Sequence, residues 1–101
     1  MISKTRQLLK RVLFLVKVEG ESCWPFLIPN KYYLATNLLK PKENDFIVFI
    51  NPKNKEEIFV KRVKYVYDDF YFVEGTVSWS DSSKEFGLVN KDLILGKIIN
   101  I

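Results

Sequence analysis

Short runs of hydrophobic residues, separated by clusters of turn-forming residues, set the pattern of this chain. Residues 12–18 alternate in a way that predicts a first β-strand after a short helical or loose lead-in. Residues 32–36 predict a second strand. Residues 46–50 are hydrophobic at every position, which is typical of a strand buried on both faces and predicts a central place in a sheet.

The clearest local signal is a β-hairpin in the second half of the chain. Its arms are residues 58–67 and 70–74, and only two aspartates separate them, as a tight connection requires. The polar stretch 76–85 is predicted to be irregular, and residues 93–101 to close the domain as a last strand. Short strands with no long helical period indicate an all-β domain, a small barrel or coiled sheet.

Length and composition narrow the class of protein. A chain of 101 residues, 48% of them hydrophobic, suits one folded domain. It has one cysteine and no histidine, so an internal disulfide is excluded and a structural zinc site nearly so. We expect neither a metal nor a cofactor, and any hydrolytic chemistry has to use serine, cysteine, lysine, aspartate or glutamate.

The net charge of +4 is concentrated near the N-terminus. Residues 1–18 contain five basic residues and no acidic one, so the rest of the chain has a net charge of −1. We divide the chain into a basic lead-in, residues 1–10, and a β domain, residues 11–101. The lead-in is either a solvated segment or a contact with an anionic membrane surface. The nearly neutral domain disfavours nucleic acid as a partner, and its longest apolar run falls far short of the roughly 20 residues of a membrane span.

A hydroxyl follows the first strand at a position suited to function. Gly20 permits a bend, Ser22 and Cys23 stand side by side, and Pro25 prevents a regular element from continuing. A side chain on such a rigid turn is presented rather than buried. The alternative is an ordinary corner between a strand and a turn.

Lys61 interrupts a hydrophobic strand. In the alternation of that strand it shares the hydrophobic face with Phe59 and Val63. A lysine facing inward has to pair, reach the solvent along its stem or lose its proton, since burial can lower a lysine pKa by about 3–5 units. A neutral amine beside Ser22 would activate the hydroxyl as a nucleophile. The alternative is a strand lysine whose amine reaches solvent.

These residues belong to a series of short motifs that follow one another along the chain. The motifs are Val18-x-Gly20-x-Ser22-Cys23-x-Pro25-x-Leu27, Asp45-Phe46-Ile47-Val48-Phe49, Val60-Lys61-Arg62-Val63, Ser80-Asp81-Ser82 followed by Phe86-Gly87, and Ile94-x-Gly96-Lys97. In their types and order they resemble the successive motifs of type I signal peptidases. The resemblance covers about residues 18–98, and it extends less specifically to self-cleaving repressors of the SOS response and to nickel superoxide dismutase maturation proteases.

The resemblance implies an all-β serine endopeptidase that processes a precursor peptide with a serine–lysine dyad. Ser22 matches the nucleophile, and Lys61 matches the general base. The oxyanion would be met by the backbone N–H of Ser22, helped by the turn at Gly20.

The chain departs from the family pattern at several positions. Cys23 stands where the family usually has methionine, and we interpret it as a packing residue rather than as the nucleophile. Asn30 and Asn44 stand at turns where the family has glycine, which asparagine can replace because it tolerates positive φ. Thr76 and Val77 stand where an aspartate and an asparagine are usual, so the polar network around the lysine differs.

The polar loop after the hairpin carries the candidate support for the lysine. We expect Ser80 to hold the Lys61 amine, with Ser78 and Ser82 as competing partners because the register of the loop is open. Asp81 is expected to order the loop rather than to act in catalysis.

The resemblance also suggests a substrate and a location. Such enzymes bind an extended peptide as an added strand. Trp24 and Phe26 would line that groove or contact lipid, unless they belong to the core. The family's usual transmembrane anchor has no counterpart here, which favours a dedicated protease acting on one cytoplasmic or membrane-peripheral precursor.

Two other classes of function stay open. One is a catalytically inactive relative that binds peptides. The other is a small β-barrel that binds single-stranded nucleic acid, with Tyr32, Tyr33, Phe70 and Tyr71 as stacking residues.

Overall fold

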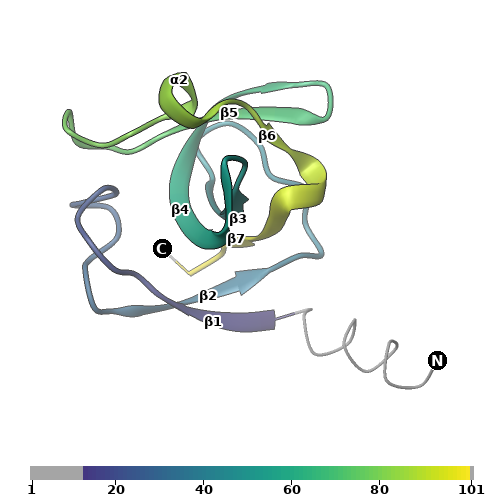
Figure 1. Ribbon diagram of the computed structural model, residues 1–101. Coiled ribbons are helices and arrows are strands. Elements are labelled where there is room, and N and C mark those ends of the chain that lie inside the picture. The colour runs from purple at the N-terminus through teal and green to yellow at the C-terminus, as the bar shows by residue number, and fades with distance from the viewer. Residues whose placement is uncertain (1–12, 101) are drawn as a thin grey trace.

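Seven strands form one antiparallel sheet in the computed structural model, which describes residues 13–100 (Figure 1). The strands are β1 (Leu13–Lys17), β2 (Tyr32–Thr36), β3 (Phe46–Asn51), β4 (Asn54–Tyr67), β5 (Phe70–Glu74), β6 (Val89–Asn90) and β7 (Ile94–Ile98). Their order in the sheet is β1-β2-β7-β3-β4-β5-β6. The all-β prediction is therefore confirmed, while the lead-in predicted for residues 1–10 lies outside the described residues.

The sheet coils because β4 belongs to both of its halves. The first part of β4 pairs with β3, the last part pairs with β5, and Arg62 is in register with a residue on each side. Figure 1 shows β4 as a strongly curved ribbon between these two partners. The predicted hairpin is present, with Asp68 at a φ of 54° in its two-residue turn.

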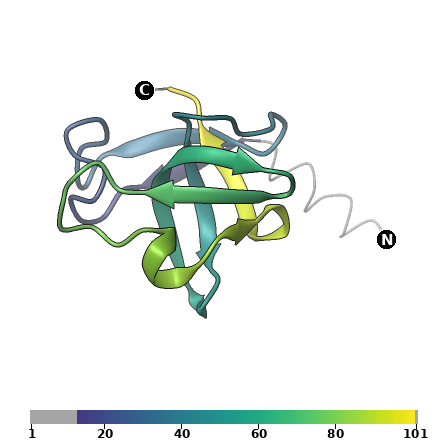
Figure 2. The same cartoon turned by 90° about the horizontal axis from the view of Figure 1, so that it is seen from above.

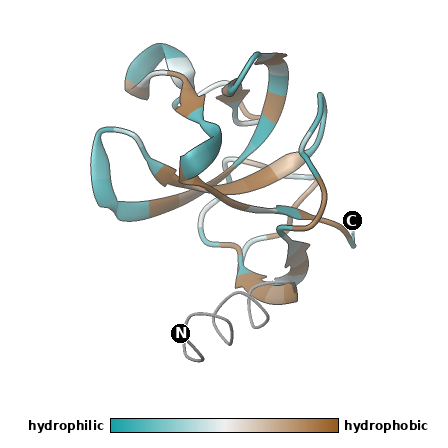
Figure 3. Cartoon of the chain, turned by 90° about the vertical axis from the view of Figure 1, so that its right-hand side faces the viewer, coloured by the Kyte–Doolittle hydropathy of each residue, from teal (hydrophilic) through white to brown (hydrophobic). Residues whose placement is uncertain are grey.

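Two small cores lie on opposite faces of β3. Phe46 and Val48 pack into the first core, whereas Ile47 and Phe49 pack into the second. This alternation explains why every position of the strand is hydrophobic, and it confirms the central place predicted for it. Figure 3 shows the hydrophobic residues concentrated on the strands and the turns largely hydrophilic.

Three short elements were not predicted from the hydrophobic pattern. They are the one-turn helix α2 (Ser83–Phe86), the two-residue strand β6, and the 3-10 turn η1 (Lys91–Leu93). The prediction that residues 76–85 are irregular is wrong for the start of α2. A capping box explains it, since Ser82 accepts from the backbone and Glu85 accepts from the Ser82 N–H at 2.7 Å.

The turns use the residues that their backbone angles require. Gly20, Asn30 and Asn44 have φ values of 76°, 67° and 73°. The expectation that the two asparagines tolerate these turns is confirmed. Within residues 13–100, no helix has the length and hydrophobicity to cross a membrane.

Candidate functional site

The loop between β1 and β2 holds Ser22 in a fixed position. The Asn30 N–H donates to the Val18 carbonyl at 2.7 Å and closes the base of the loop. Inside it, the Leu27 N–H donates to the Cys23 carbonyl at 2.9 Å, and both of these side chains are buried in the first core. Ser22 directly precedes the buried Cys23 and stays partly exposed. A serine held in this way meets the first requirement for a nucleophile, access to a substrate.

Lys61 points into the protein from β4. Its side chain is only 6% exposed, and its Nζ lies 5.7 Å from the centre of the Phe59 ring, on the face that the alternation predicted. The Nζ donates a hydrogen bond to Ser80 Oγ at 2.6 Å. Among the described residues no carboxylate lies within ion-pair distance of this amine. The alternative of a strand lysine that reaches solvent is therefore wrong.

Burial acts on the charge of this amine. Desolvation lowers the pKa of Lys61 because water can no longer stabilise the ammonium form. Negative charge on Cys23, Asp81 or Glu85 would raise it. Burial also raises the pKa of the Cys23 thiol. Desolvation is the largest of the effects on Lys61, so the net direction of its pKa is downward, towards the neutral form that a general base needs.

The loop after β5 lies beside the Ser22 loop, as two views of the ribbon show (Figures 1 and 2). The Thr76 N–H donates to the Ser22 carbonyl at 2.6 Å, and Thr76 Oγ1 donates to the Trp24 carbonyl at the same distance. Thr76 departs from the signal peptidase pattern, yet it ties the two loops together. Two hydrogen bonds therefore connect the loop that carries Ser80, the partner of Lys61, to the loop that carries Ser22.

Gly75 occupies the tightest point between these residues. A Cβ atom built on it would lie 2.5 Å from the Ser22 carbonyl oxygen and would overlap Ser80 Oγ. Only glycine fits here, since any side chain would push apart the carbonyl of the candidate nucleophile and the hydroxyl that holds Lys61.

Ser22 and Lys61 are brought to one region but do not hydrogen-bond to each other. Ser22 Oγ contacts Cys23 Sγ at 3.9 Å, and Cys23 Sγ contacts the carbonyl of Val60, the residue before Lys61, at 3.2 Å. Catalytic hydrogen bonds are often longer before a substrate is bound. Contacts through Cys23, Gly75 and Ser80 link the two residues indirectly.

The serines near Lys61 have distinct places. Ser80 Oγ donates to the Asp81 carbonyl at 3.1 Å and so keeps a lone pair for the Lys61 amine. Ser82, offered by the sequence as a competing partner, caps α2 and contacts Glu85 instead. Ser78 is exposed and lines the pocket described below.

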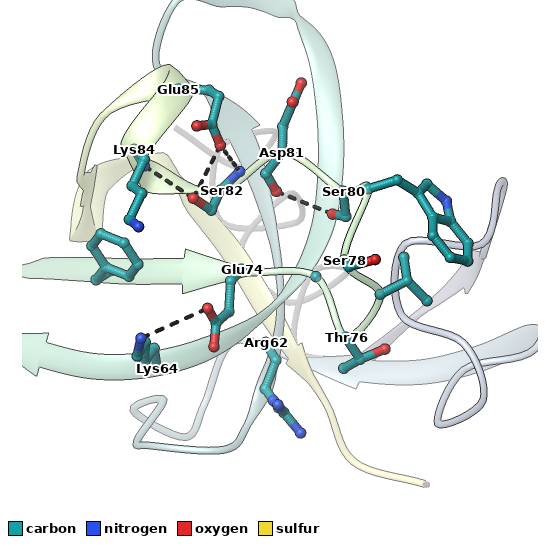
Figure 4. A pocket seen from close by; sticks show the side chains of 14 residues that line it. Arg62, Lys64, Glu74, Thr76, Ser78, Ser80, Asp81, Ser82, Lys84 and Glu85 are labelled. Atoms are coloured by element: carbon teal, nitrogen blue, oxygen red, sulfur yellow. Dashed lines mark hydrogen bonds and ion pairs between the residues drawn. The ribbon is translucent and has the colours of Figure 1, made fainter.

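Two hollows flank the region that holds Ser22 and Lys61. The smaller, of about 270 Å³, lies between β1 and the first half of β4, and its walls include Ser22 with Val16, Val18, Ile58 and Val60. The larger, of about 780 Å³, lies between β4, β5, α2 and the loop after β5, and Gly75, Thr76 and Ser80 are among the residues that line it. Figure 4 shows this pocket from close by. The sequence pattern gave no sign of the larger pocket.

Several aromatic residues lie where the sequence left their position open. Trp24 is 51% exposed and Phe26 is 50% exposed, so the alternative that they are core residues is wrong. The stacking role considered for nucleic acid is wrong for Tyr33 and Tyr71, because both are buried. Trp79, which the sequence did not single out, is exposed at the edge of the larger pocket.

Comparison with known proteins adds no family to this picture. No model of a protein family matches the chain, and no curated protein matches it. The function is therefore argued below from the residues and their geometry.

Proposed function

We propose that this protein is a serine endopeptidase in which Ser22 is the nucleophile and Lys61 the general base. The observation that carries the proposal is the state of the Lys61 amine. It is buried, it has a hydroxyl as its hydrogen-bond partner instead of a carboxylate, and desolvation lowers its pKa. A lysine used only for structure would gain by pairing with a negative charge or by reaching water.

The proposed reaction uses the groups in a fixed order. Neutral Lys61 removes the proton of Ser22 Oγ as this oxygen attacks the carbonyl carbon of the peptide bond. The ammonium then gives that proton to the departing amine, and a water molecule activated by Lys61 hydrolyses the acyl-enzyme. Ser80 accepts one N–H of the lysine and so orients the amine. Closure of the gap between Ser22 and Lys61 on substrate binding would complete the dyad.

The smaller hollow supports an extended peptide as the substrate. Among the described strands, β1 pairs only with β2, and residues 58–61 of β4 pair only with β3, so each has a free edge. The hollow separates these two stretches, and a peptide strand could bind there with main-chain hydrogen bonds. Half of the residues in its walls are Val or Ile, the others are Lys17, Glu19, Ser22 and Phe59, and its volume is small, which favours small side chains before the cleaved bond.

Peptide cleavage tests this proposal directly. The protein is incubated with a mixture of peptides derived from a bacterial proteome, and new termini are identified by mass spectrometry. Wild-type protein should cut, Ser22→Ala should not cut although it folds normally, and Cys23→Ala should retain most activity. An uncut mixture would refute the peptidase. A thiol-alkylating reagent that inactivates wild type but not Cys23→Ala would refute the choice of nucleophile.

A second candidate is an inactive peptide-binding module. It is favoured by the hydrogen bond of Lys61, which goes to Ser80 and not to Ser22. In that case peptides with small residues would bind to the wild type and to Ser22→Ala equally, and neither protein would cut them.

A further inference from the structure

The outer face of β1 and β2 carries large hydrophobic side chains. Figure 1 shows these two strands at the lower edge of the molecule, away from β5, β6 and α2. Alternation places Leu13 and Leu15 on the face opposite to Phe14 and Val16, which pack on the first core. Leu13, Leu15 and Tyr32 are 52%, 68% and 59% exposed. We call these three residues the outer patch.

The register of the two strands extends this patch across the sheet. Leu15 is opposite Leu34 and Lys17 is opposite Tyr32, and opposite residues of an antiparallel pair have their side chains on the same face. The Ile99 N–H donates to the Leu34 carbonyl at 2.9 Å, and Ile99 is itself exposed. A continuous exposed hydrophobic surface marks a contact with a partner or with a membrane.

The charges of the chain are divided between its two parts. Residues 1–42 contain eight basic and two acidic residues, a net charge of +6, so residues 43–101 have a net charge of −2. The two acids, Glu19 and Glu21, belong to the Ser22 loop, and neither β1 nor β2 contains one. Residues 1–12, which lead directly into β1, contain four basic residues and no acid. The outer patch thus lies in the basic part of the chain.

Two exposed lysines border the outer patch. Lys17 is opposite Tyr32, and Lys31 directly precedes Tyr32. Within residues 13–100, neither lysine forms an ion pair. Glu19, the acid nearest to Lys17 along the chain, lies beyond the end of the strand and pairs with neither lysine. Both amines are therefore available to a negatively charged partner.

We propose that the outer patch docks the protein on a membrane surface that carries anionic lipids. Leu13 and Leu15 would enter the boundary between headgroups and acyl chains, and Tyr32 would lie among the headgroups. Lys17, Lys31 and the basic residues of the lead-in would attract the lipid phosphates. A single weak signal gives only marginal binding to a membrane, so the hydrophobic patch and the basic lead-in are both required.

A membrane fits this surface better than a nucleic acid or a second copy of the chain. Exposed leucines offer nothing to phosphates or to bases, which bind basic and aromatic side chains. A second copy that paired through the same face would bring two basic regions together, and like charges repel. A lipid interface takes up hydrophobic side chains and positive charge together.

Co-sedimentation of the full chain with vesicles tests this docking without requiring peptide cleavage. One set of vesicles is pure phosphatidylcholine, and the other is phosphatidylcholine mixed with phosphatidylglycerol. Wild type should bind the anionic vesicles more tightly, and high salt should weaken this binding. Leu15→Ser should weaken it by about tenfold, because one leucine is no longer removed from water. Urea unfolding checks that this variant is folded.

Matched variants elsewhere on the surface locate the contact. Leu88→Ser is the control for Leu15→Ser, since Leu88 is also exposed but precedes β6, at the other end of the sheet. Lys17→Gln should weaken binding by about fivefold, the contribution of one basic residue near an anionic surface. Lys84→Gln, on α2, removes the same charge and should leave binding unchanged.

The outcomes of these measurements are independent of the proposed peptidase. Equal binding of Leu15→Ser and wild type, or equal weakening by Lys17→Gln and Lys84→Gln, would overturn the docking face even if the protein cuts peptides. Equal binding to both kinds of vesicle would overturn it as well. Binding of oligothymidylate, or a dimer in solution, that Leu15→Ser abolishes would assign the face to a nucleic acid or to a second copy instead. Vesicle binding that depends on Leu15 in a protein that cuts nothing would keep the docking face and refute the peptidase.

Discussion

Replacement of Lys61 by methionine should abolish peptide cleavage without destabilising the fold. Methionine retains an unbranched apolar stem of similar length, so the burial of the side chain is preserved. It lacks the amine, which is the candidate general base. Most substitutions at a residue that is only 6% exposed destabilise a protein. Unchanged stability of Lys61→Met is therefore expected only if burial of the charged amine is itself unfavourable.

The expected magnitude follows from two opposing contributions. The variant loses the hydrogen bond from Lys61 to Ser80, which is worth about 0.5–1.5 kcal/mol net. Ser80 Oγ keeps its bond to the Asp81 carbonyl. The wild type loses about 1.36 kcal/mol of folding free energy for each unit by which folding lowers the pKa of Lys61. The variant has no amine and does not lose this free energy. Because desolvation lowers the pKa of Lys61, the free energy of unfolding of Lys61→Met should equal or exceed that of the wild type at pH 7.

The difference should depend on pH with a definite sign. Where the folded pKa lies below the unfolded value of 10.5, the unfolded chain binds more protons between the two values. The lysine therefore destabilises the wild type fully below its folded pKa, and this penalty disappears as the pH rises towards 10.5. Lys61→Met lacks the effect, so its advantage in unfolding free energy should shrink between pH 7 and pH 10.

Urea unfolding of both proteins at several pH values measures this difference, and peptide cleavage measures the activity. The reasoning is refuted if Lys61→Met is less stable than wild type by more than about 2 kcal/mol at pH 7, since the amine would then be a structural tie. It is also refuted if the advantage of the variant grows with pH. Activity of wild type should rise with pH as Lys61 loses its proton, because only the neutral amine is a base.

The remaining predictions concern charge, close packing and the lead-in. Lys61→Arg should be inactive and destabilised by several kcal/mol, because a guanidinium stays charged; an active variant of normal stability in urea would sink the dyad. Gly75→Ala should lower the stability by about 1–3 kcal/mol and reduce cleavage, since its Cβ would overlap Ser80 and crowd the Ser22 carbonyl; unchanged kcat/KM would show that the two loops can separate freely. Deletion of residues 1–10 should remove weak, salt-sensitive binding to anionic vesicles, and co-sedimentation equal to that of the full chain would leave those residues without this role.

The strands of this protein could be predicted where the local sequence decides the structure. The stretch from Phe46 to Ile50 is hydrophobic at every position, so the strand β3 was predicted. The Asp68-Asp69 turn marks the hairpin of β4 and β5, so that hairpin was predicted as well. The strand β6 could not be found in this way, because Val89 and Asn90 are too short a stretch to show a period. Their pairing with β5 comes from the position of η1 and α2 around them.

In the candidate site, too, the features decided by local sequence could be predicted and those decided by contacts between distant residues could not. The inward position of Lys61 follows from alternation within one strand, which is a local property, and it was predicted. Ser80, and not Ser78 or Ser82, binds Lys61 because of the position of the loop after β5. Thr76 holds this loop in position by donating a hydrogen bond to the Ser22 carbonyl. No period or motif in the loop encodes a bond to a residue 54 positions away.

Gly75 shows why such a site is recognised only when both loops are in place. In the sequence it is one of four glycines, and it follows a strand, where a glycine is ordinary. In the fold it is the point at which the carbonyl of Ser22 and the hydroxyl of Ser80 approach each other too closely for a side chain. A loop that served only to connect β5 to α2 would not need that approach. The missing Cβ is therefore better explained by the need to bring Ser22 to the partner of Lys61 than by the turn itself.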